Sequence, residues 1–265
     1  MIEEMFARHK IRQLFGPRQR VTVDNAQVPD GVRVYAVGDI HGRNDLLERL
    51  HGRIAQDARS LTAGVRPIVV YLGDYVDRGL HSREVIDLLL DQPLAGFETH
   101  YLKGNHDQQL LDFLATPASG ANWMRYGGDA TLYSYGVRFP KDQPRAFHLK
   151  LMSDQLREII PERHLAFFQG LKLTYQAGDY LFVHAGIHPE KRMEDQSVDD
   201  MLWIREEFLE SDADLGKVVV HGHSVSDLPE VRDNRIGVDT GAVFSNRLSC
   251  LVLEGSRRRF LSTRD

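Results

Sequence analysis

Short runs of β-branched and aromatic residues alternate with amphipathic stretches through the first half of the chain. Three such runs, at residues 33–37, 67–72 and 97–102, are each followed by a polar loop and then by a helical pattern, over 43–59, over 82–91 and from about residue 108. In the first of these helices, Leu46, Leu47, Leu50 and Ile54 recur at the spacing of one helical face. Successive strand–loop–helix units predict an α/β sheet with crossover helices.

The pattern changes in the second half of the chain. The pattern over residues 120–170 predicts mostly helix, with a loop-rich segment at 125–136. One more helix is expected over about 198–210. Closely spaced strand-like runs begin at Leu171, which favours mixed or antiparallel pairing; they cover residues 171–176, 180–186, 217–223, 234–240 and 247–255. The predicted fold class is therefore α/β, a layered sandwich of mixed β-sheets flanked by helices.

Composition and charge narrow the class of protein. The chain has 265 residues, of which 42% are hydrophobic and 27% charged, and this balance excludes disordered, collagen-like and membrane-spanning proteins. With a net charge of −5, the chain lacks the basic character that proteins need to bind nucleic acids unspecifically. No signal-peptide pattern occurs at the start of the chain, and Cys250, the single cysteine, cannot form an internal disulfide. We therefore expect a cytoplasmic protein with no nucleic-acid and no membrane partner.

The domain organisation is expected to be simple. Residues 1–31 form a polar lead-in with room for one short helix, and residues 32–265 form a single domain, because no repeat, low-complexity tract or linker divides them. The sequence leaves the oligomeric state open.

Five polar clusters directly follow the strand-like runs. They are GDIHG at 38–42, GDYVDRG at 73–79, GNHD at 104–107, HAG at 184–186 and HGH at 221–223. Each alone has an ordinary structural explanation, such as an Asx turn, a helix cap or a buried histidine. Because loops at the carboxyl ends of strands converge, five together indicate one shared site. Carboxylates, imidazoles and a carboxamide without thiolates suit Mn, Fe or Zn.

The order GDIHG, GDYVDRG, GNHD, HAG, GHS resembles that of the metallophosphoesterases, specifically the phosphoprotein phosphatase family of serine/threonine phosphatases. The resemblance covers about residues 33–253, and the segments LWIREEF (202–208) and RIGVDTGA (235–242) are similar to bacterial members. That family more often has Glu at the position of Asp107. Val225 stands where nuclease and phosphodiesterase members carry a second histidine after GH, which disfavours those activities.

The resemblance implies a centre of two divalent metal ions, with manganese expected and iron or zinc as alternatives. Its ligands would be Asp39 and His41 on the first metal, Asp74 bridging both, and Asn105, His184 and His223 on the second. Two cations that share a carboxylate lie about 3.5–4 Å apart and supply a hydroxide that attacks phosphorus directly. His221, two positions before His223, is expected to line the site or to be a buried histidine without a metal.

The resemblance also assigns the groups that act on the substrate. Arg78 and Arg205 would hold phosphate oxygens, for which the guanidinium fork is suited. On a continuous helix, Arg205 would have no acidic neighbour one turn away, which weakens its interpretation as a surface ion pair. His106 would be the general acid, oriented by Asp77.

The expected activity is hydrolysis of phosphoserine and phosphothreonine, with a phosphoprotein or phosphopeptide as partner. The alternative is hydrolysis of dinucleoside polyphosphates such as diadenosine tetraphosphate, because the family includes such enzymes. A non-catalytic phosphoprotein-binding module is a third hypothesis, disfavoured because every expected ligand is present. Whether segment 120–161 forms a substrate groove or a cap stays open at this point.

Overall fold

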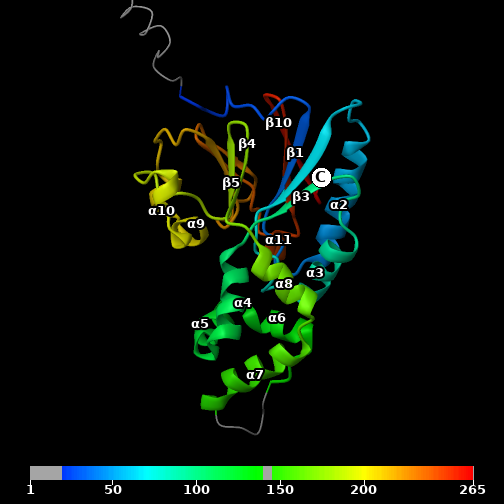
Figure 1. The fold of residues 1–265 in the computed structure, drawn as a ribbon, viewed down its shortest axis with the longest axis vertical. Helices are drawn as coiled ribbons and strands as arrows, with labels where there is room; N and C mark the ends of the chain where they lie inside the picture. The colour runs from blue at the N-terminus through cyan, green and yellow to red at the C-terminus, as the bar shows by residue number, and fades with distance from the viewer. Residues whose placement is uncertain (1–19, 140–144, 265) are drawn as a thin grey trace, which may run out of the picture.

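The computed structural model describes residues 20–139 and 145–264, which form two five-stranded sheets and a group of helices (Figure 1). The first sheet has the order β10–β9–β1–β2–β3, in which β1, β2 and β3 are parallel and β9 and β10 are antiparallel to their neighbours. Its strands are β1 (Val32–Val37), β2 (Arg66–Tyr71), β3 (Glu98–Tyr101), β9 (Ser249–Glu254) and β10 (Arg257–Ser262).

The second sheet has the order β4–β5–β6–β8–β7. β5, β6 and β8 are parallel, and β4 and β7 add to the two edges in antiparallel pairing. Its strands are β4 (Thr174–Ala177), β5 (Tyr180–Val183), β6 (Val218–His221), β7 (Glu230–Val231) and β8 (Arg235–Gly237). The predicted fold class, with mixed sheets and flanking helices, is confirmed.

The alternation of side chains along β1 explains why the two sheets pack face to face. All six residues of β1 are buried, because both of its faces are covered. Val34 and Ala36 face the second sheet, where they join a core that includes Phe182 of β5, whereas Tyr35 and Val37 join the core under the helices. Val23, Ala26 and Val28 extend the core between the sheets, so residues 20–31 include buried apolar positions beside the expected polar ones.

Helices cover the outer faces and build a lobe at one end of the sheets (Figure 1). α2 and α3 pack on the first sheet, and α9 and α10 lie beside the second. The helices are α2 (Asn44–Ala58), α3 (Ser82–Asp91), α4 (Asn105–Ala115), α5 (Gly120–Trp123), α6 (Gly128–Tyr135), α7 (Arg145–Ile159), α8 (Glu162–Gly170), α9 (Val198–Trp203), α10 (Glu206–Leu209) and α11 (Ala242–Ser245). Short 3₁₀ helices occur at η1 (Pro117–Ser119), η2 (Met124–Tyr126) and η3 (Met193–Asp195).

Three sequence predictions need correction. The helix expected from about residue 108 begins at Asn105, because the Asp107 carboxylate accepts the Gly104 N–H (2.8 Å) and caps the first turn. The segment expected to be loop-rich contains α6, which lies between two glycines with positive φ. The helix expected over 198–210 is broken into α9 and α10, because Ile204 (ψ 143°) leaves the helical region.

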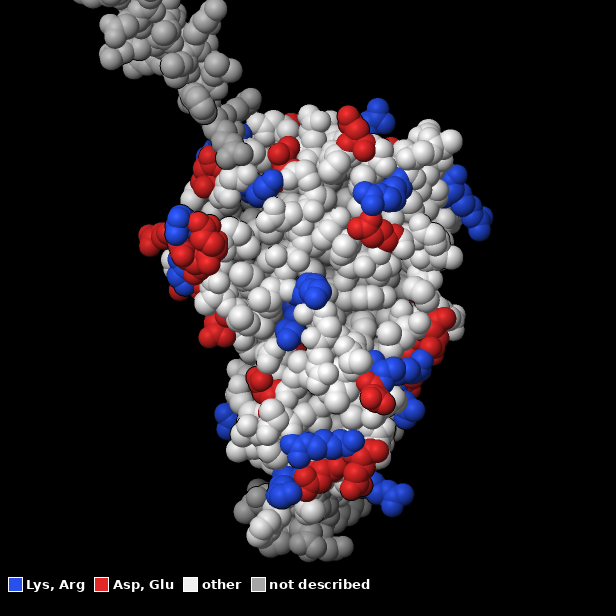
Figure 2. Space-filling model, in the orientation of Figure 1, with Lys and Arg blue, Asp and Glu red and all other residues white. Residues whose placement is uncertain are grey.

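The charged surface is mixed on the face that Figure 2 shows, where acidic and basic side chains are interspersed. Within the described part of the chain, no helix combines the length and apolar character needed to cross a bilayer.

The core between the sheets leads to a stability prediction. Phe182 is fully buried there, so Phe182→Ala should lower the free energy of unfolding by about 3–5 kcal/mol. The matched control is Phe244→Ala, because that ring is 74% exposed, and its effect should stay within about 0.5 kcal/mol. Urea unfolding measures both values, and equal losses for the two variants would contradict this assignment of the core.

Candidate metal centre

The predicted site residues lie at the carboxyl ends of the parallel strands in both sheets. Five segments carry all of them except Arg205: the loop after β1 (Asp39, His41), the loop after β2 (Asp74, Asp77, Arg78), the start of α4 (Asn105, His106), the loop after β5 (His184) and the loop after β6 (His223). Because the two sheets pack face to face, these loops meet at one end of the sandwich. The convergence expected from the strand-like runs is thus present across two sheets rather than along one.

Close contacts between polar atoms join the loops of the two sheets. The backbone N–H of His223 donates to the carboxylate of Asp39, at 3.1 and 3.3 Å. The Nε2 atom of His184 lies 2.8 Å from Oδ1 of Asn105, and Nδ1 of His223 lies 3.0 Å from the same oxygen. The second group of predicted ligands is therefore assembled from both sheets.

The backbone of these loops adopts a conformation that L-residues rarely occupy. Of the six described non-glycine residues with positive φ, five belong to the predicted site: His41 (47°), Asp74 (53°), Asp77 (74°), Arg78 (66°) and His223 (61°). Such conformations cost free energy and persist where the surrounding structure imposes them, most often at functional sites. The strain concentrates at this end of the sandwich.

Two glycines leave the space that the carboxylates need. A Cβ atom at Gly104 would lie 2.1 Å from Oδ1 of Asp74, and one at Gly222 would lie 2.1 Å from Oδ1 of Asp39. Any side chain at either position would displace a carboxylate. The glycines of GNHD and GHS thus have a steric role in the site.

The hydrogen bonds of His184 test whether a cation fits. Its Nδ1 lies 2.9 Å from the carbonyl oxygen of Leu72, so in the neutral ring this nitrogen carries the proton. The lone pair of Nε2 then points at Oδ1 of Asn105, and Nε2 lies 3.5 Å from Oδ2 of Asp74. Three electron-pair donors that face each other without a proton between them form an arrangement that a cation would stabilise.

His41 makes the same two kinds of contact, with a backbone carbonyl at Nδ1 and with Oδ2 of Asp74 at Nε2. Its Nδ1 lies 2.8 Å from the carbonyl oxygen of Val76, and its Nε2 lies 3.5 Å from Oδ2 of Asp74. Burial lowers the pKa of His41 to about 3 and that of His223 to about 2, so both rings are neutral, as metal ligands must be.

Two groups of candidate ligands share Asp74. In the groups His41–Asp74–His106 and Asp74–His184–His223, the ligand atoms of each lie within 4.8 Å of one another, and all five residues are buried. The shared carboxylate agrees with the bridging role that the resemblance implies for Asp74. Asn105 contacts the second group through Oδ1, whereas Asp39 belongs to neither group and accepts the backbone N–H of His223. The first group contains His106, for which the resemblance implies the role of general acid instead. The residues present fit divalent cations, and their individual ligand roles stay a prediction.

A further carboxyl group, Asp239, was not predicted. It follows β8, is buried, and interacts with Asp39. Burial raises the pKa of Asp239 to about 6, and burial together with the Asp239 charge raises the pKa of Asp39. Asp239 lies near the end of the strand-like run 234–240 and within the segment RIGVDTGA, and this position was the sequence feature that pointed to it. Bound cations would offset the repulsion among these buried carboxylates.

The guanidinium group of Arg78 reaches into the same space. Its Nη1 lies 3.0 Å from Nε2 of His41, and its Nη2 lies 3.1 Å from Nε2 of His106. The fork therefore stands between a candidate ligand and the candidate general acid, where a phosphate oxygen would be held.

Arg205 also lies close to the candidate metal centre, but the backbone around it differs from the continuous helix that was expected. It lies between α9 and α10 rather than inside a helix, so the argument from its helical neighbours does not apply. Its Nη1 donates to Oγ of Ser224 (3.3 Å), the residue after His223, and its charge contributes to lowering the pKa of His184 and His223. The side chain is exposed and available to a ligand.

A buried network orients His106. Its Nδ1 lies 2.7 Å from Oδ2 of Asp77, which also accepts hydrogen bonds from Nε1 of Trp123 (2.6 Å) and, at Oδ1, from Thr131 (2.6 Å). Trp123 belongs to α5 and Thr131 to α6, so part of segment 120–161 contacts the site by holding the carboxylate of Asp77. Sequence reasoning did not identify either residue, since neither type signals a carboxylate partner.

Two positions left open by the sequence have clear surroundings. The carboxylate of Asp107 accepts backbone N–H groups of Asp74 (2.9 Å), Tyr75 (3.1 Å) and Gly104 (2.8 Å), and thereby ties two loops of the site together. His221 is buried against the ring of Phe208, 5.1 Å away between centroids, and belongs to neither group of candidate ligands in the described residues.

A family model for the calcineurin-like phosphoesterases (Metallophos) matches residues 32–244. The chain belongs to this family. The phosphoesterase is 28% identical to serine/threonine-protein phosphatase 2 of Escherichia coli K12, over 82% of this chain and 90% of that protein. It is 24% identical to the asymmetrical bis(5'-nucleosyl)-tetraphosphatase PrpE of Bacillus thuringiensis Al Hakam, over 81% and 88% of the two chains.

A solved structure shows the same fold. The crystal structure of a candidate diadenosine tetraphosphatase superposes with a TM-score of 0.58 at 23% identity and covers 89% of this chain and 98% of that chain. Together with the matched family, the buried ligand groups indicate that this phosphoesterase uses divalent metals.

The shared carboxylate leads to a test of the metal centre. Asp74→Asn should lower the metal content per chain at both positions, because a neutral carboxamide cannot replace a carboxylate common to two cations. Elemental analysis of the purified phosphoesterase gives the content. Asp77→Asn is the matched control, since Asp77 is buried close by, belongs to neither ligand group and contacts His106, the expected general acid. Two full equivalents of metal in Asp74→Asn would overturn the bridging role.

The arginines lead to a test of phosphate binding. Arg78→Ala and Arg205→Ala should each leave the metal content unchanged and lower kcat/KM for p-nitrophenyl phosphate. A loss of about 10²–10³ is expected if the hydrogen bond from the arginine to a phosphate oxygen strengthens in the transition state. Arg83→Ala in α3 serves as control, because that side chain is exposed and pairs with Asp87. Near-normal turnover in either variant would show that the arginine does not hold phosphate.

Proposed function

We propose that this phosphoesterase is a serine/threonine protein phosphatase that hydrolyses phosphoserine and phosphothreonine in phosphoproteins or phosphopeptides. The observation that carries the proposal is the buried pair of His106 and Asp77, 2.7 Å apart, beside the candidate metal ligands. A serine or threonine alkoxide is a strongly basic leaving group and needs a proton as the bond to phosphorus breaks. A histidine held by a carboxylate provides that proton.

The surroundings of His106 keep the proton available. Burial lowers its pKa, but the charge of Asp74 and the hydrogen bond and charge of Asp77 outweigh burial, so the pKa lies above the usual value. Nδ1 of His106 faces Asp77 and Nε2 faces Nη2 of Arg78, so Nε2 is the nitrogen on the side where a phosphate would lie. The two N–H donors of Arg78 would meanwhile hold phosphate oxygens. Divalent cations at the centre would supply positive charge against the phosphate and activate the attacking water.

A pocket beside Arg205 supports a peptide substrate. Its volume is about 320 Å³, and its lining includes Trp203 and the exposed carboxylates of Asp199, Glu206 and Glu207. The ring of Trp203 lies 6.2 Å from that of His223, so the pocket opens next to the candidate metal ligands. Carboxylates repel a polyphosphate chain and attract basic side chains of a peptide.

The second candidate is hydrolysis of dinucleoside tetraphosphates. It is favoured by the similarity to the Bacillus thuringiensis tetraphosphatase, which covers nearly as much of the chain as the similarity to the Escherichia coli phosphatase. The leaving group in that reaction is a nucleotide phosphate, which is stable without a proton. Parallel assays with a phosphoserine peptide and diadenosine tetraphosphate separate the two candidates, because only the first substrate depends strongly on a general acid.

The general acid has a direct test. His106→Asn should slow hydrolysis of a phosphoserine peptide far more than that of p-nitrophenyl phosphate, because p-nitrophenolate leaves without a proton. Asp77→Asn should show the same pattern more weakly, since Asp77 only orients and charges the imidazole. The measurement is kcat for both substrates, with metal content as the control for intact ligands. Equal slowing of both substrates with the metals retained would contradict the role of His106 as the acid.

A further inference from the structure

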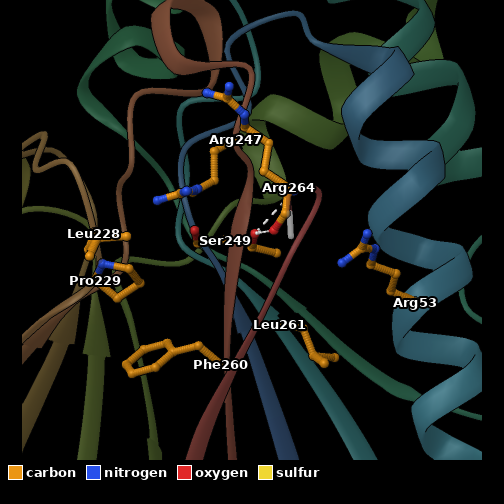
Figure 3. A pocket seen from close by; sticks show the side chains of 9 residues that line it. Arg53, Leu228, Pro229, Arg247, Ser249, Phe260, Leu261 and Arg264 are labelled. Atoms are coloured by element: carbon orange, nitrogen blue, oxygen red, sulfur yellow. Dashed lines mark hydrogen bonds between the residues drawn. The ribbon is translucent and has the colours of Figure 1, made fainter.

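A pocket outside the metal centre lies where β9 begins and β10 ends (Figure 3). Its volume of about 500 Å³ is within the range of sites for small organic molecules. Its lining comes from α2, the loop before β7, β9, β10 and the residues next to them: Arg53, Leu228, Pro229, Arg247, Ser249, Phe260, Leu261, Ser262 and Arg264. None of these residues belongs to the predicted catalytic site.

The described part of the lining carries positive charge. Three of the described lining residues are arginines, and none of the described ones is acidic. In the described part of the chain, Arg247 and Arg264 form no ion pair, and each is held by a backbone carbonyl instead: Arg247 Nη1 donates to Asp227 (2.9 Å) and Arg264 Nη1 to Ser245 (2.8 Å). The fixed guanidinium groups thus keep further N–H donors for an anion.

One of those donors is buried without an acceptor. The Nε atom of Arg247 has no hydrogen-bond partner among the described residues, although solvent does not reach it. Leaving a buried charged donor unsatisfied costs free energy, and an acceptor that reaches Nε after a small shift of the surrounding side chains would recover it. The Nη groups of Arg247 and Arg264 offer the remaining donors. Guanidinium groups match the oxygens of phosphate in geometry as well as in charge.

The rest of the lining is apolar. Leu228 is 62% exposed and Phe260 is 36% exposed, and Pro229 and Leu261 lie beside the same pocket. Figure 3 shows Arg247 and Arg264 toward one end of the pocket and Phe260 toward the other. A ligand that satisfies both ends carries phosphate at one side and a flat ring, suited to packing on an aromatic side chain, at the other.

We propose that this pocket binds a nucleoside phosphate, with Arg247 and Arg264 on the phosphate oxygens and Phe260 against the base. The site is separate from the metal centre but is linked to it by the chain. Leu228 and Pro229 lie on the loop that starts at His223, and Ser249 accepts the N–H of Gly38, the residue before Asp39. The proposal does not depend on which phosphate ester the metal centre hydrolyses.

The test is equilibrium dialysis of the full-length protein with β,γ-imido-ATP, a non-hydrolysable analogue. Arg247→Ala and Arg264→Ala should each weaken binding about tenfold to a hundredfold, as expected for the loss of a charged hydrogen bond. Arg232→Ala is the matched control, because Arg232 is exposed, pairs with Glu230 and does not line the pocket. Arg78→Ala, which alters the metal centre, should leave this binding unchanged.

Two partial ligands test the two ends of the pocket. Pyrophosphate should bind more weakly than the analogue and lose its binding in Arg247→Ala, whereas Phe260→Ala should affect only the analogue. Unchanged affinity in both arginine variants, loss of binding in Arg78→Ala alone, or no binding at millimolar analogue would each overturn the proposal.

Hydrogen exchange adds a readout that does not depend on a variant folding. The analogue should slow exchange at residues 226–230, 247–249 and 260–264. Slowing confined to the loops of the metal centre would place the nucleotide there and overturn the proposal.

Discussion

The position of one buried carboxylate, that of Asp74, constrains most of the structure around it. The carbonyl oxygen of Asp74 accepts the N–H groups of Ile40 and His41, its own N–H donates to Asp107, and its Oδ1 accepts the N–H of His106. Burial raises its pKa, but four surrounding imidazoles outweigh burial and lower it, so the group is held as a carboxylate. A buried negative charge in this position requires a backbone donor, imidazole neighbours and a glycine without a Cβ, and loops of both sheets together supply them.

The two parts of the molecule contribute differently to the site. The sheets present candidate metal ligands from loops that follow parallel strands, and those loops are strained at five side-chain-bearing positions. The helical lobe contributes little to the ligands themselves, but Trp123 and Thr131 determine how Asp77 is oriented, and Asp77 determines the orientation of His106. The position of the candidate metal ligands thus depends on the packing of the sheets, and the proton donation proposed for His106 would depend on the packing of the lobe against them.

This division agrees with similarity to both a serine/threonine-protein phosphatase and a bis(5'-nucleosyl)-tetraphosphatase. Phosphate is the common element of a phosphoprotein and a dinucleoside tetraphosphate, and a metal centre with an arginine fork addresses phosphate alone. The rest of the substrate, peptide or nucleoside, must be recognised by side chains at the rim of the candidate metal centre. In this chain the rim near Arg205 contains Trp203 and acidic residues in and around α10, whereas the basic pocket at β9 and β10 lies apart from it.

The sequence by itself determined the fold class and most of the candidate site, because strand-like runs, helical spacing and the clusters at strand ends are local patterns. Residues such as Asp39, Asp74 and Asn105 were identified in this way. The division of the strands into two sheets, the break at Arg205 and the strand β10 depended on tertiary structure. β10 begins with three arginines and lies at an exposed edge, where no apolar alternation marks a strand. Asp239, Trp123 and Thr131 were missed because their partners are distant in the sequence. The bond of Trp123 to Asp77 spans 46 residues, and only the packing of the helical lobe brings the two together.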